Sequence, residues 1–359
     1  MNPSNCQKQF GHADFDRDRV RNRIEVACPV LGCSATMVAV PFGKRKRPDG
    51  TAESRLLPWC PDHGIRIHSG TFVYWNGHDS QEDARLRNFI VRPNLVRTLA
   101  LGKGMKVESH RLGYEMSEDA LSWNVFVSLS VAGKLRQTAE FLTGRKLLAE
   151  PLLYLWGRRV DTVSGGHAAY QPLLRVRHEL ERGIAPFVTE PDIMLVAEGE
   201  LLISIEAKFG SGNPLAYNSA TTDGEKPTSR AGLLARYLGP NTSEATRRRV
   251  QPDPMLGRLH SQLFRNIVFA SEMAGETPWH VVNLVSSTQR SIRNDVRYSF
   301  GDPTAEVQKY MHPGCRDWFT YRTWEQLHAS VIWDDANLTE LDRYLRGKSA
   351  HYLPAFELG

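Results

Sequence analysis

Residues 191 to 208 contain two apolar stretches separated by the polar residues Glu198-Gly199-Glu200, a pattern that predicts a β-hairpin with a tight turn. Charged residues stand at the ends of these strands: Asp192 opens the first, and Glu206 and Lys208 close the second. Because Glu206 and Lys208 are two residues apart, both side chains point to one face of the strand. We expect the folded hairpin to bring all three charges together.

Carboxylates that converge on one point repel each other unless a cation lies between them, and their hard oxygen atoms suit Mg²⁺ or Mn²⁺. A lysine beside such an ion can orient an attacking water molecule and stabilise the charge that develops on a phosphate. The alternative is an amphipathic hairpin with solvated charges. An apolar run directly before Glu206 does not fit that alternative, because an exposed strand alternates with polar residues.

Pro191-Asp192 followed by Glu206-Ala207-Lys208 resembles the signature of the PD-(D/E)xK nuclease superfamily, whose members share the restriction-endonuclease-like fold. The resemblance implies that Asp192, Glu206 and the backbone carbonyl of Ala207 hold one or two Mg²⁺ or Mn²⁺ ions. It also implies that Lys208 positions the nucleophile. The expected reaction is hydrolysis of a phosphodiester bond.

A helix is expected upstream of the hairpin, with Ser117 as its N-cap, acids in its first turn and apolar residues at helical spacing as far as residue 135. In many members of the superfamily the first helix carries an acid that reaches the metal site, and Glu118 is the matching residue. Asp119 is the neighbouring alternative, although it points about a hundred degrees away. A plain capping role for Glu118 stays open.

A second helix is expected over residues 255 to 274, after the hairpin. In several branches of the superfamily this helix directs a Gln or a basic side chain into the site. Gln262 is the candidate here, and Arg265 is the weaker one. Both residues can equally belong to a solvated helix face.

Four metal ligands occur as two tight pairs, Cys28-x4-Cys33 and Cys60-x2-His63, and each pair is accompanied by a Pro and a Gly that bend the backbone. Such knuckles are what a tetrahedral Zn²⁺ site requires. His68 is the alternative fourth ligand. Three thiolates and one imidazole would close the site, so the expected zinc is structural, as in the zinc-ribbon or treble-clef modules that this segment resembles. Buried free cysteines beside a chance histidine are the other interpretation.

The chain has 359 residues, of which 41% are hydrophobic, so it can bury a sizeable core. A net charge of +5 permits a polyanionic partner without requiring one. Five cysteines argue against a disulfide framework, and no stretch has the length of a membrane helix. We therefore expect a cytoplasmic protein with no membrane contact.

Two basic runs, residues 44 to 47 and 247 to 249, lie in segments rich in Gly, Pro, Ser and Thr, as expected of mobile loops that contact phosphates. Solvated loops are the alternative. Residues 157 to 183 are also basic and are expected to be irregular. The long, weakly patterned stretch from 211 to 254 is the candidate for a substrate clamp or a homodimer contact.

The expected fold class is α/β, with a mixed central sheet flanked by helices in a restriction-endonuclease-like core and a small N-terminal zinc module. Apolar strands at 152 to 156 and 279 to 285 complete its order of helix, three strands, helix and strand. The expected domains are residues 1 to 100, the zinc module with its leader and connector, and residues 101 to 359, the nuclease domain.

We expect an Mg²⁺-dependent endonuclease acting on DNA, with restriction or phage defence as its role. The alternatives are a nuclease of recombination or repair, an RNA-cleaving nuclease, and a nucleic-acid-binding protein on an inactive nuclease-like scaffold. A zinc metalloenzyme is disfavoured because the chain has no His-Glu-x-x-His sequence.

Overall fold

The computed structural model describes residues 25–30, 32–38, 59–68, 70–74, 87–91, 98, 101, 111–161, 165–182, 189–217, 236–252, 258–288 and 298–359. The basic run at 44 to 47 and most of the expected connector therefore lie outside the described residues. So do residues 218 to 235 and 253 to 254 of the stretch expected to form a clamp or dimer contact. The fold that positions the candidate site is fully within the described part.

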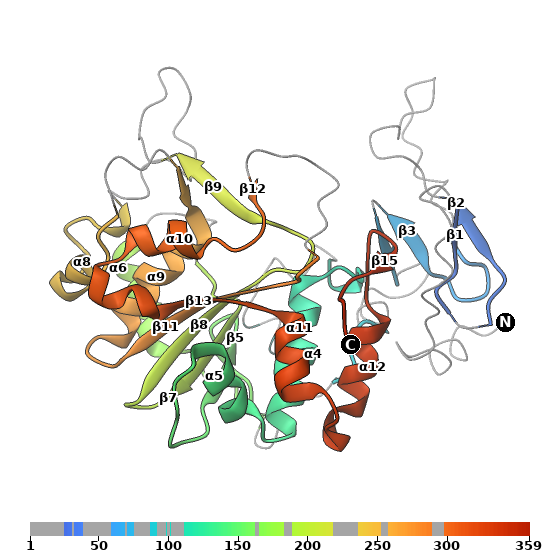
Figure 1. Ribbon diagram of the computed structural model, residues 1–359, viewed down its shortest axis with the longest axis horizontal. Coiled ribbons are helices and arrows are strands. Elements are labelled where there is room, and N and C mark those ends of the chain that lie inside the picture. Colours follow the sequence, from blue (N-terminus) through green and yellow to red (C-terminus); the bar gives the residue numbers. More distant parts are fainter. Residues whose placement is uncertain are drawn as a thin grey trace.

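A six-stranded mixed sheet forms the centre of the molecule (Figure 1). Its strand order is β13-β11-β8-β7-β5-β6. The strands pair in two ways: β7 is antiparallel to both of its neighbours, β5 and β8, whereas β8, β11 and β13 run parallel. The strands are β5 (Leu152–Leu155), β6 (Arg158–Arg159), β7 (Ile193–Ala197), β8 (Leu201–Ala207), β11 (Trp279–Val285) and β13 (Phe319–Thr323).

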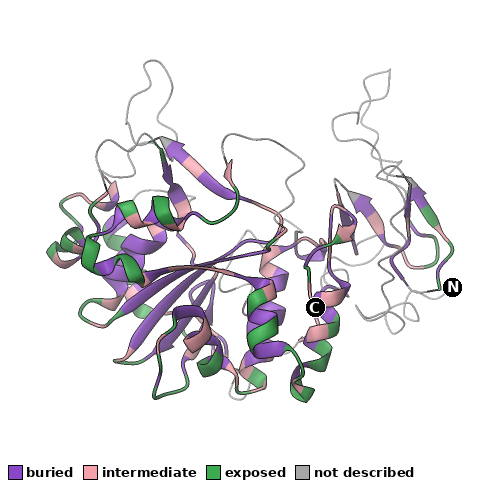
Figure 2. Ribbon diagram, in the orientation of Figure 1, coloured by how far each residue is buried: buried purple, intermediate pink, exposed green. Residues whose placement is uncertain are grey.

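The three central strands are buried on both faces, because helices cover both sides of the sheet. Every residue of β7, β8 and β11 is buried, as the continuous buried colour of the sheet shows (Figure 2). One face packs against a hydrophobic cluster built on α4 (Glu118–Val131), α5 (Leu135–Thr143) and the C-terminal helices. The other face packs against α6 (Gln171–Leu180) and α9 (Ser261–Ala274).

The remaining α-helices complete these layers. They are α8 (Glu244–Arg249), α10 (Thr304–Val307), α11 (Trp324–Leu327) and α12 (Thr339–Gly347). A three-stranded sheet of β9 (Asn213–Tyr217), β10 (Arg258–His260) and β12 (Tyr298–Ser299) lies beside the main sheet. Helix α9 connects β10 to β11, and β11 is parallel to β8. The helix therefore runs opposite to these strands, so its N-terminal end faces the carboxyl end of β8.

Two short hairpins form the N-terminal module at the far side of the molecule (Figure 1). The first pairs β1 (Glu25–Ala27) with β2 (Thr36–Val38), and the second pairs β3 (Arg66–His68) with β4 (Thr71–Val73). Their small hydrophobic cluster contains Val26, Ile67 and Phe72 together with Tyr352 from the other end of the chain. The short C-terminal strands β14 (Ser349–Ala350) and β15 (Leu353–Pro354) flank this tyrosine.

Several expectations about elements are confirmed, including the hairpin, the strands near 152 and 279, and the helix capped by Ser117, whose hydroxyl accepts a hydrogen bond from the Ala120 amide at 3.2 Å. The single helix expected as far as residue 135 is wrong. Gly133 adopts a positive φ of 65° after α4, and α5 then begins as a separate helix. Buried side chains surround most of α4, so it is a core helix rather than an amphipathic one.

The two basic segments expected to be irregular contain helices. Within residues 157 to 183, the buried side chains of Leu173, Val176 and Leu180 recur at helical spacing and hold α6 against the sheet. The run at 247 to 249 belongs to α8, whose N-cap is Ser243. The expectation of a mobile loop at that run is therefore wrong.

Candidate metal centres

The carboxyl end of β8 gathers the charges of the hairpin. Ile193 pairs with Ile205, so the register places Asp192 beside Glu206. The Asp192 carboxylate accepts a hydrogen bond from the Ala207 amide at 3.0 Å, which ties the entry of β7 to the exit of β8. Asp192 remains partly exposed.

Glu206 and Lys208 form a buried ion pair on the face of β8 that packs against α9. The Lys208 Nζ atom lies 2.5 Å from Glu206 Oε1, and the two side chains are only 6% and 4% exposed. The other carboxylate oxygen of Glu206 accepts a hydrogen bond from Asn266 Nδ2 at 2.7 Å. Both oxygens of Glu206 are thus held by protein donors.

Glu118 reaches the same place from the first turn of α4. Its Oε1 atom accepts hydrogen bonds from the Phe209 amide at 2.9 Å and from the Ser211 hydroxyl at 2.6 Å. The residue after it points elsewhere, because Asp119 accepts a hydrogen bond from the Trp156 indole at 2.9 Å. Of the two acids at the start of α4, Glu118 is therefore the one that lies at the end of β8.

These acids lie close enough to Lys208 to shift the pKa of its ammonium group. Burial alone would lower the pKa of its ammonium. The carboxylates of Glu206, Glu118 and Asp192 outweigh burial and raise that pKa well above its ordinary value. Four of the residues expected from the sequence to form the site are thus brought together: Asp192, Glu206, Glu118 and Lys208.

Three buried asparagines at this end of the sheet escaped the sequence analysis. Asn266 contacts Glu206 directly, and Asn283 lies beside Glu206 on the neighbouring strand β11. The Asn283 amide donates to the Glu206 carbonyl at 3.4 Å, and Asn213 donates to Asn283 Oδ1 at 2.9 Å. The signal for Asn283 was a polar residue within a mostly apolar stretch, Trp279–Val285, which contains one other polar residue, His280.

The α9 candidates occupy different positions from Asn266. Gln262 and Arg265 are half-buried, and the α9 side chain that contacts Glu206 is Asn266, four residues after Gln262.

On α8, two guanidinium groups bind the protein itself. Arg247 donates to the carbonyls of Gly239 and Thr242, and Arg249 donates to the carbonyl of Gly275 at 2.7 Å.

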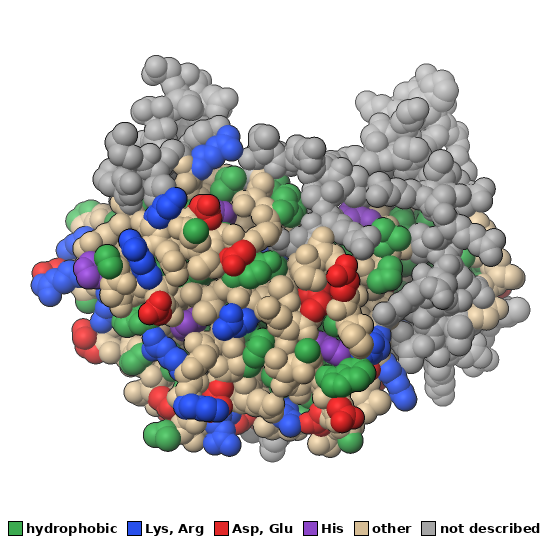
Figure 3. Space-filling view, in the orientation of Figure 1, with side chains coloured by type: hydrophobic (Ala, Val, Ile, Leu, Met, Phe, Trp, Pro, Cys, Tyr) green, Lys and Arg blue, Asp and Glu red, His purple; other side chains and the backbone are tan. Residues whose placement is uncertain are grey.

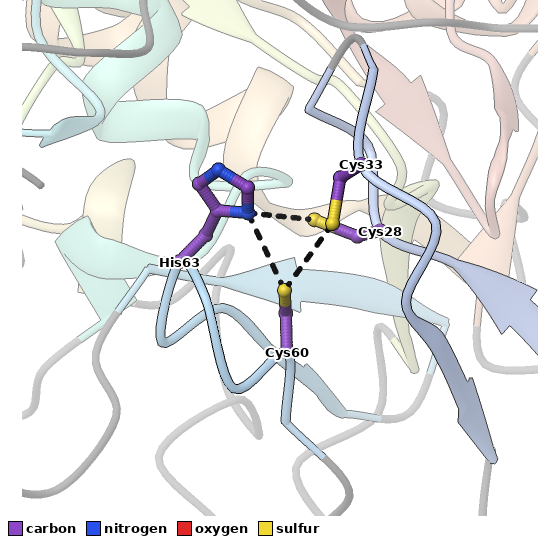
Figure 4. Close-up of side chains that lie close together, drawn as sticks. All are labelled: Cys28, Cys33, Cys60 and His63. Atoms are coloured by element: carbon purple, nitrogen blue, oxygen red, sulfur yellow. Dashed lines mark hydrogen bonds between the residues drawn. The ribbon is translucent and has the colours of Figure 1, made fainter.

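The second centre lies in the N-terminal module, where Cys28, Cys33, Cys60 and His63 face one another (Figure 4). Both knuckles are closed by backbone hydrogen bonds, including Cys28 to Ala35 and Cys60 to Ile65, each at 2.8 Å. Glycines with positive φ turn the chain within each knuckle, at positions 32 and 64. This local folding aims the four ligand atoms inward.

The spacing of the ligand atoms suits a tetrahedral metal. All four lie within 4.8 Å of one another, and the Sγ atoms of Cys33 and Cys60 are 3.6 Å apart. His63 Nδ1 lies 3.6 Å from Cys28 Sγ and 3.4 Å from Cys60 Sγ. Ligands bound to tetrahedral zinc at about 2.0–2.3 Å would be separated by about 3.6–3.8 Å. The cluster can therefore hold a metal such as zinc.

The thiols of this cluster shift one another's pKa values. A hydrogen bond from the Cys28 thiol lowers the pKa of Cys60 to about 5, against the opposing effect of burial. The same hydrogen bond and burial raise the pKa of Cys28. A bound cation would favour thiolates at all three cysteines. His63 completes the group in place of the alternative His68, whose side chain is outside the described part.

Among the described residues, no helix has both the length and the apolar character needed to cross a membrane. Comparisons of the chain with protein-family models, with curated proteins and with solved structures found no match.

Proposed function

We propose that the protein is a metal-dependent nuclease that hydrolyses phosphodiester bonds in DNA. The observation that carries this proposal is the convergence of Asp192, Glu206 and Glu118 around the Lys208 ammonium at the end of β8. A scaffold has no need to bury such a cluster, because burying charges costs free energy. The order α4, β5, β7, β8, α9 and β11 also agrees with a restriction-endonuclease-like core.

The donor set fits Mg²⁺ or Mn²⁺. Three carboxylates bring three negative charges, of which the Lys208 ammonium balances one, and a divalent cation would balance the other two. Asp192, Glu206 and the carbonyl oxygen of Ala207 are the groups that would hold the ion, with Glu118 available for a second one. When bound, the ion supplies Lewis acidity toward a water molecule and toward the phosphate.

The protein's own residues have separate roles in this proposal. Lys208 directs the attacking water and places a fixed positive charge where negative charge develops on the phosphate. The amides of Ala207 and Phe209 fix the carboxylates of Asp192 and Glu118, so the acids are oriented before substrate arrives. Gln262, at the end of α9 that faces the carboxyl end of β8, is the proposed contact to water or phosphate.

The Cys28, Cys33, Cys60 and His63 centre is proposed to hold structural zinc. Four protein ligands close a tetrahedral site and leave no position for substrate. The module's hydrophobic cluster is small, so the metal would contribute directly to its folding.

On the face in Figure 3, Lys and Arg side chains are interspersed with Asp and Glu. Among the described side chains on that face, no single basic stripe marks a path for DNA.

The test is a cleavage assay with supercoiled and linear duplex DNA, single-stranded DNA and RNA, each with Mg²⁺, Mn²⁺ or EDTA. We expect cleavage of DNA with either metal and none with EDTA. Asp192→Ala and Glu206→Ala should each abolish cleavage and retain binding to the same duplex, because one carboxylate cannot hold the ion against its hydration shell. Wild-type rates in either variant would refute the proposal. Cleavage of RNA alone would replace DNA as the substrate.

One observation favours a second candidate, a DNA-binding protein on an inactive scaffold. The Glu206–Lys208 pair is almost fully buried, with both Glu206 oxygens hydrogen-bonded, so metal must share these oxygens with Lys208 and Asn266. A carboxylate has about four lone-pair positions and can accept such sharing. The candidate is distinguished by DNA binding without any metal-dependent cleavage.

A further inference from the structure

We infer that Asn266 is a positioning residue for the metal: it fixes the Glu206 carboxylate without neutralising it. This inference rests on the proposed function. The Asn266 amide lies 2.7 Å from Glu206 Oε2, on the opposite oxygen from the one that Lys208 contacts. Asn266 is 2% exposed and Glu206 is 3% exposed, so no solvent competes for this hydrogen bond.

The surroundings of Asn266 show what its amide contributes. The next residues of α9, Ile267, Val268 and Phe269, are fully buried and apolar. A leucine would fill the Asn266 position at a lower desolvation cost, so packing alone does not favour an amide there. The hydrogen bond to Glu206 is what an amide adds at this point in the core.

A neutral donor has a specific advantage here. Two hydrogen bonds on different oxygens hold the carboxylate against rotation about its last torsion, so the ligand oxygen is preorganised. A second lysine or arginine would hold it equally well but would cancel the charge that a divalent cation requires. Donors that orient a metal ligand in this way commonly change metal affinity about 10–100-fold when they are removed.

A second layer of amides supports the same residue through the backbone. Asn283 donates to the carbonyl oxygen of Glu206, and Asn213 in turn donates to Asn283. All three amides are buried, at 2%, 0% and 1% exposure for Asn266, Asn283 and Asn213. Glu206 is therefore fixed at its side chain by α9 and at its backbone by β11.

The experiment measures Mn²⁺ binding directly, from the electron paramagnetic resonance signal of free Mn²⁺, with the zinc-loaded protein in the absence of DNA. Asn266→Leu removes the donor and keeps the volume, and we expect the Kd for Mn²⁺ to rise about 10–100-fold. Asn266→Ala leaves space in which water can replace the donor, so its Kd should rise less. Ser271→Ala, which removes a buried hydroxyl on α9 that contacts Thr246 instead, should leave the Kd unchanged.

The thermal stability of the two Asn266 variants distinguishes a positioning role from a space-filling role. If Asn266 only fills space, Asn266→Ala should lose more thermal stability and more Mn²⁺ affinity than Asn266→Leu, because it leaves a cavity. Equal Mn²⁺ affinity in the wild type and in both Asn266 variants would overturn the inference alone. If the wild type and Glu206→Gln bind Mn²⁺ equally, the proposed metal site fails, and with it the proposed function.

Discussion

Lys208 is held by charges from three elements, and its removal separates metal binding from chemistry. We expect Lys208→Met to bind Mn²⁺ at least as tightly as the wild type, because a positive charge beside the ion has been removed. Cleavage should fall about 10²-fold or more, since the attacking water loses its positioning group and the phosphate loses a fixed charge. Mn²⁺ titration and single-turnover cleavage measure the two effects. Loss of Mn²⁺ binding together with cleavage would make Lys208 a structural residue only.

The zinc centre can be tested at the same scale. Cys28→Ser and Cys60→Ser each remove one thiolate from a four-ligand set, and we expect the zinc content to fall well below one equivalent per chain. Cys315 is the matched control, since it is buried and lies outside the cluster. Elemental analysis of the purified variants should therefore show full zinc in Cys315→Ser. Equal zinc in the wild type and both cluster variants would contradict the assignment.

At the scale of elements, the helix α8 changes what the basic run at 247 to 249 is expected to do. The Arg249 guanidinium is bound to the carbonyl of Gly275, at the C-terminal end of α9, and lies 3.6 Å from Glu276. Replacement of Arg249 by Gln should therefore cost about 1 kcal/mol of unfolding free energy. The slope of log DNA affinity against log salt concentration should stay the same as in the wild type.

Arg248 is the control within the same helix. Its side chain is 74% exposed and pairs with Glu244 of its own helix. Arg248→Gln should leave stability nearly unchanged, as is usual for an exposed ion pair. A reduction of the salt slope by about one in Arg248→Gln would identify a phosphate contact there. The same reduction in Arg249→Gln would contradict the role assigned to Arg249.

Local patterns predicted the elements whose sequence is dominated by one physical signal. The hairpin of β7 and β8 follows from apolar runs and a Gly turn, and Gly199 indeed has a φ of 70°. The helix α6 was missed because its basic side chains outweighed three apolar positions at helical spacing. Asn266 could not be found, because its contact with Glu206 spans 60 residues and is made only when α9 packs on the sheet.

At the scale of the whole molecule, the C-terminal segment joins parts that are far apart in sequence. Lys348 donates to Asn88 at 2.9 Å and to the Glu115 carbonyl at 2.7 Å. Ser349 donates through its amide and its hydroxyl to the Glu115 carboxylate. Beyond it, Phe356 stacks on Phe209 with ring centroids 5.4 Å apart, directly after Lys208. One short segment thus contacts Asn88 and Glu115 as well as Phe209, the residue that follows Lys208.

The buried Lys348 predicts a pH dependence of stability. Burial lowers its pKa to about 7, although the Glu115 charge opposes this. Because an unfolded lysine has a pKa of about 10.4, the unfolded state binds more protons between pH 7 and 10. The Lys348 contribution to the unfolding free energy must then rise with pH in this window, and its destabilising effect is complete below pH 7.

Urea unfolding at pH 7, 8 and 9 measures this contribution as a difference between two proteins. The wild type should gain stability relative to Lys348→Met by up to about 1.4 kcal/mol for each pH unit. Subtraction removes the effect of the cysteines, which titrate in both proteins. Parallel stability profiles would show that Lys348 is charged in the fold over the whole range.

The zinc centre and the C-terminal segment are coupled through Tyr352. Its ring packs edge-on against Phe72 at 5.2 Å, its hydroxyl accepts a hydrogen bond from the Gly70 amide at 3.3 Å, and it is 4% exposed. His351 and Tyr352 both have positive φ, at 54° and 63°, a conformation that such residues keep only where their surroundings enforce it. Loss of order in the module should therefore release this segment.

We expect chelation of zinc to accelerate amide hydrogen exchange in residues 25 to 37 and 60 to 74, and also in residues 349 to 355, because Tyr352 loses its packing partners. Exchange in β11 should stay slow, since its residues are buried in the main sheet. Tyr352→Ala should accelerate exchange at 349 to 355 while the module keeps its zinc, because none of the four ligands is changed. Unaltered protection of residues 349 to 355 after chelation would show that other contacts, such as those of Ser349 with Glu115 and of Ala355 with Ser286, hold the segment without the module.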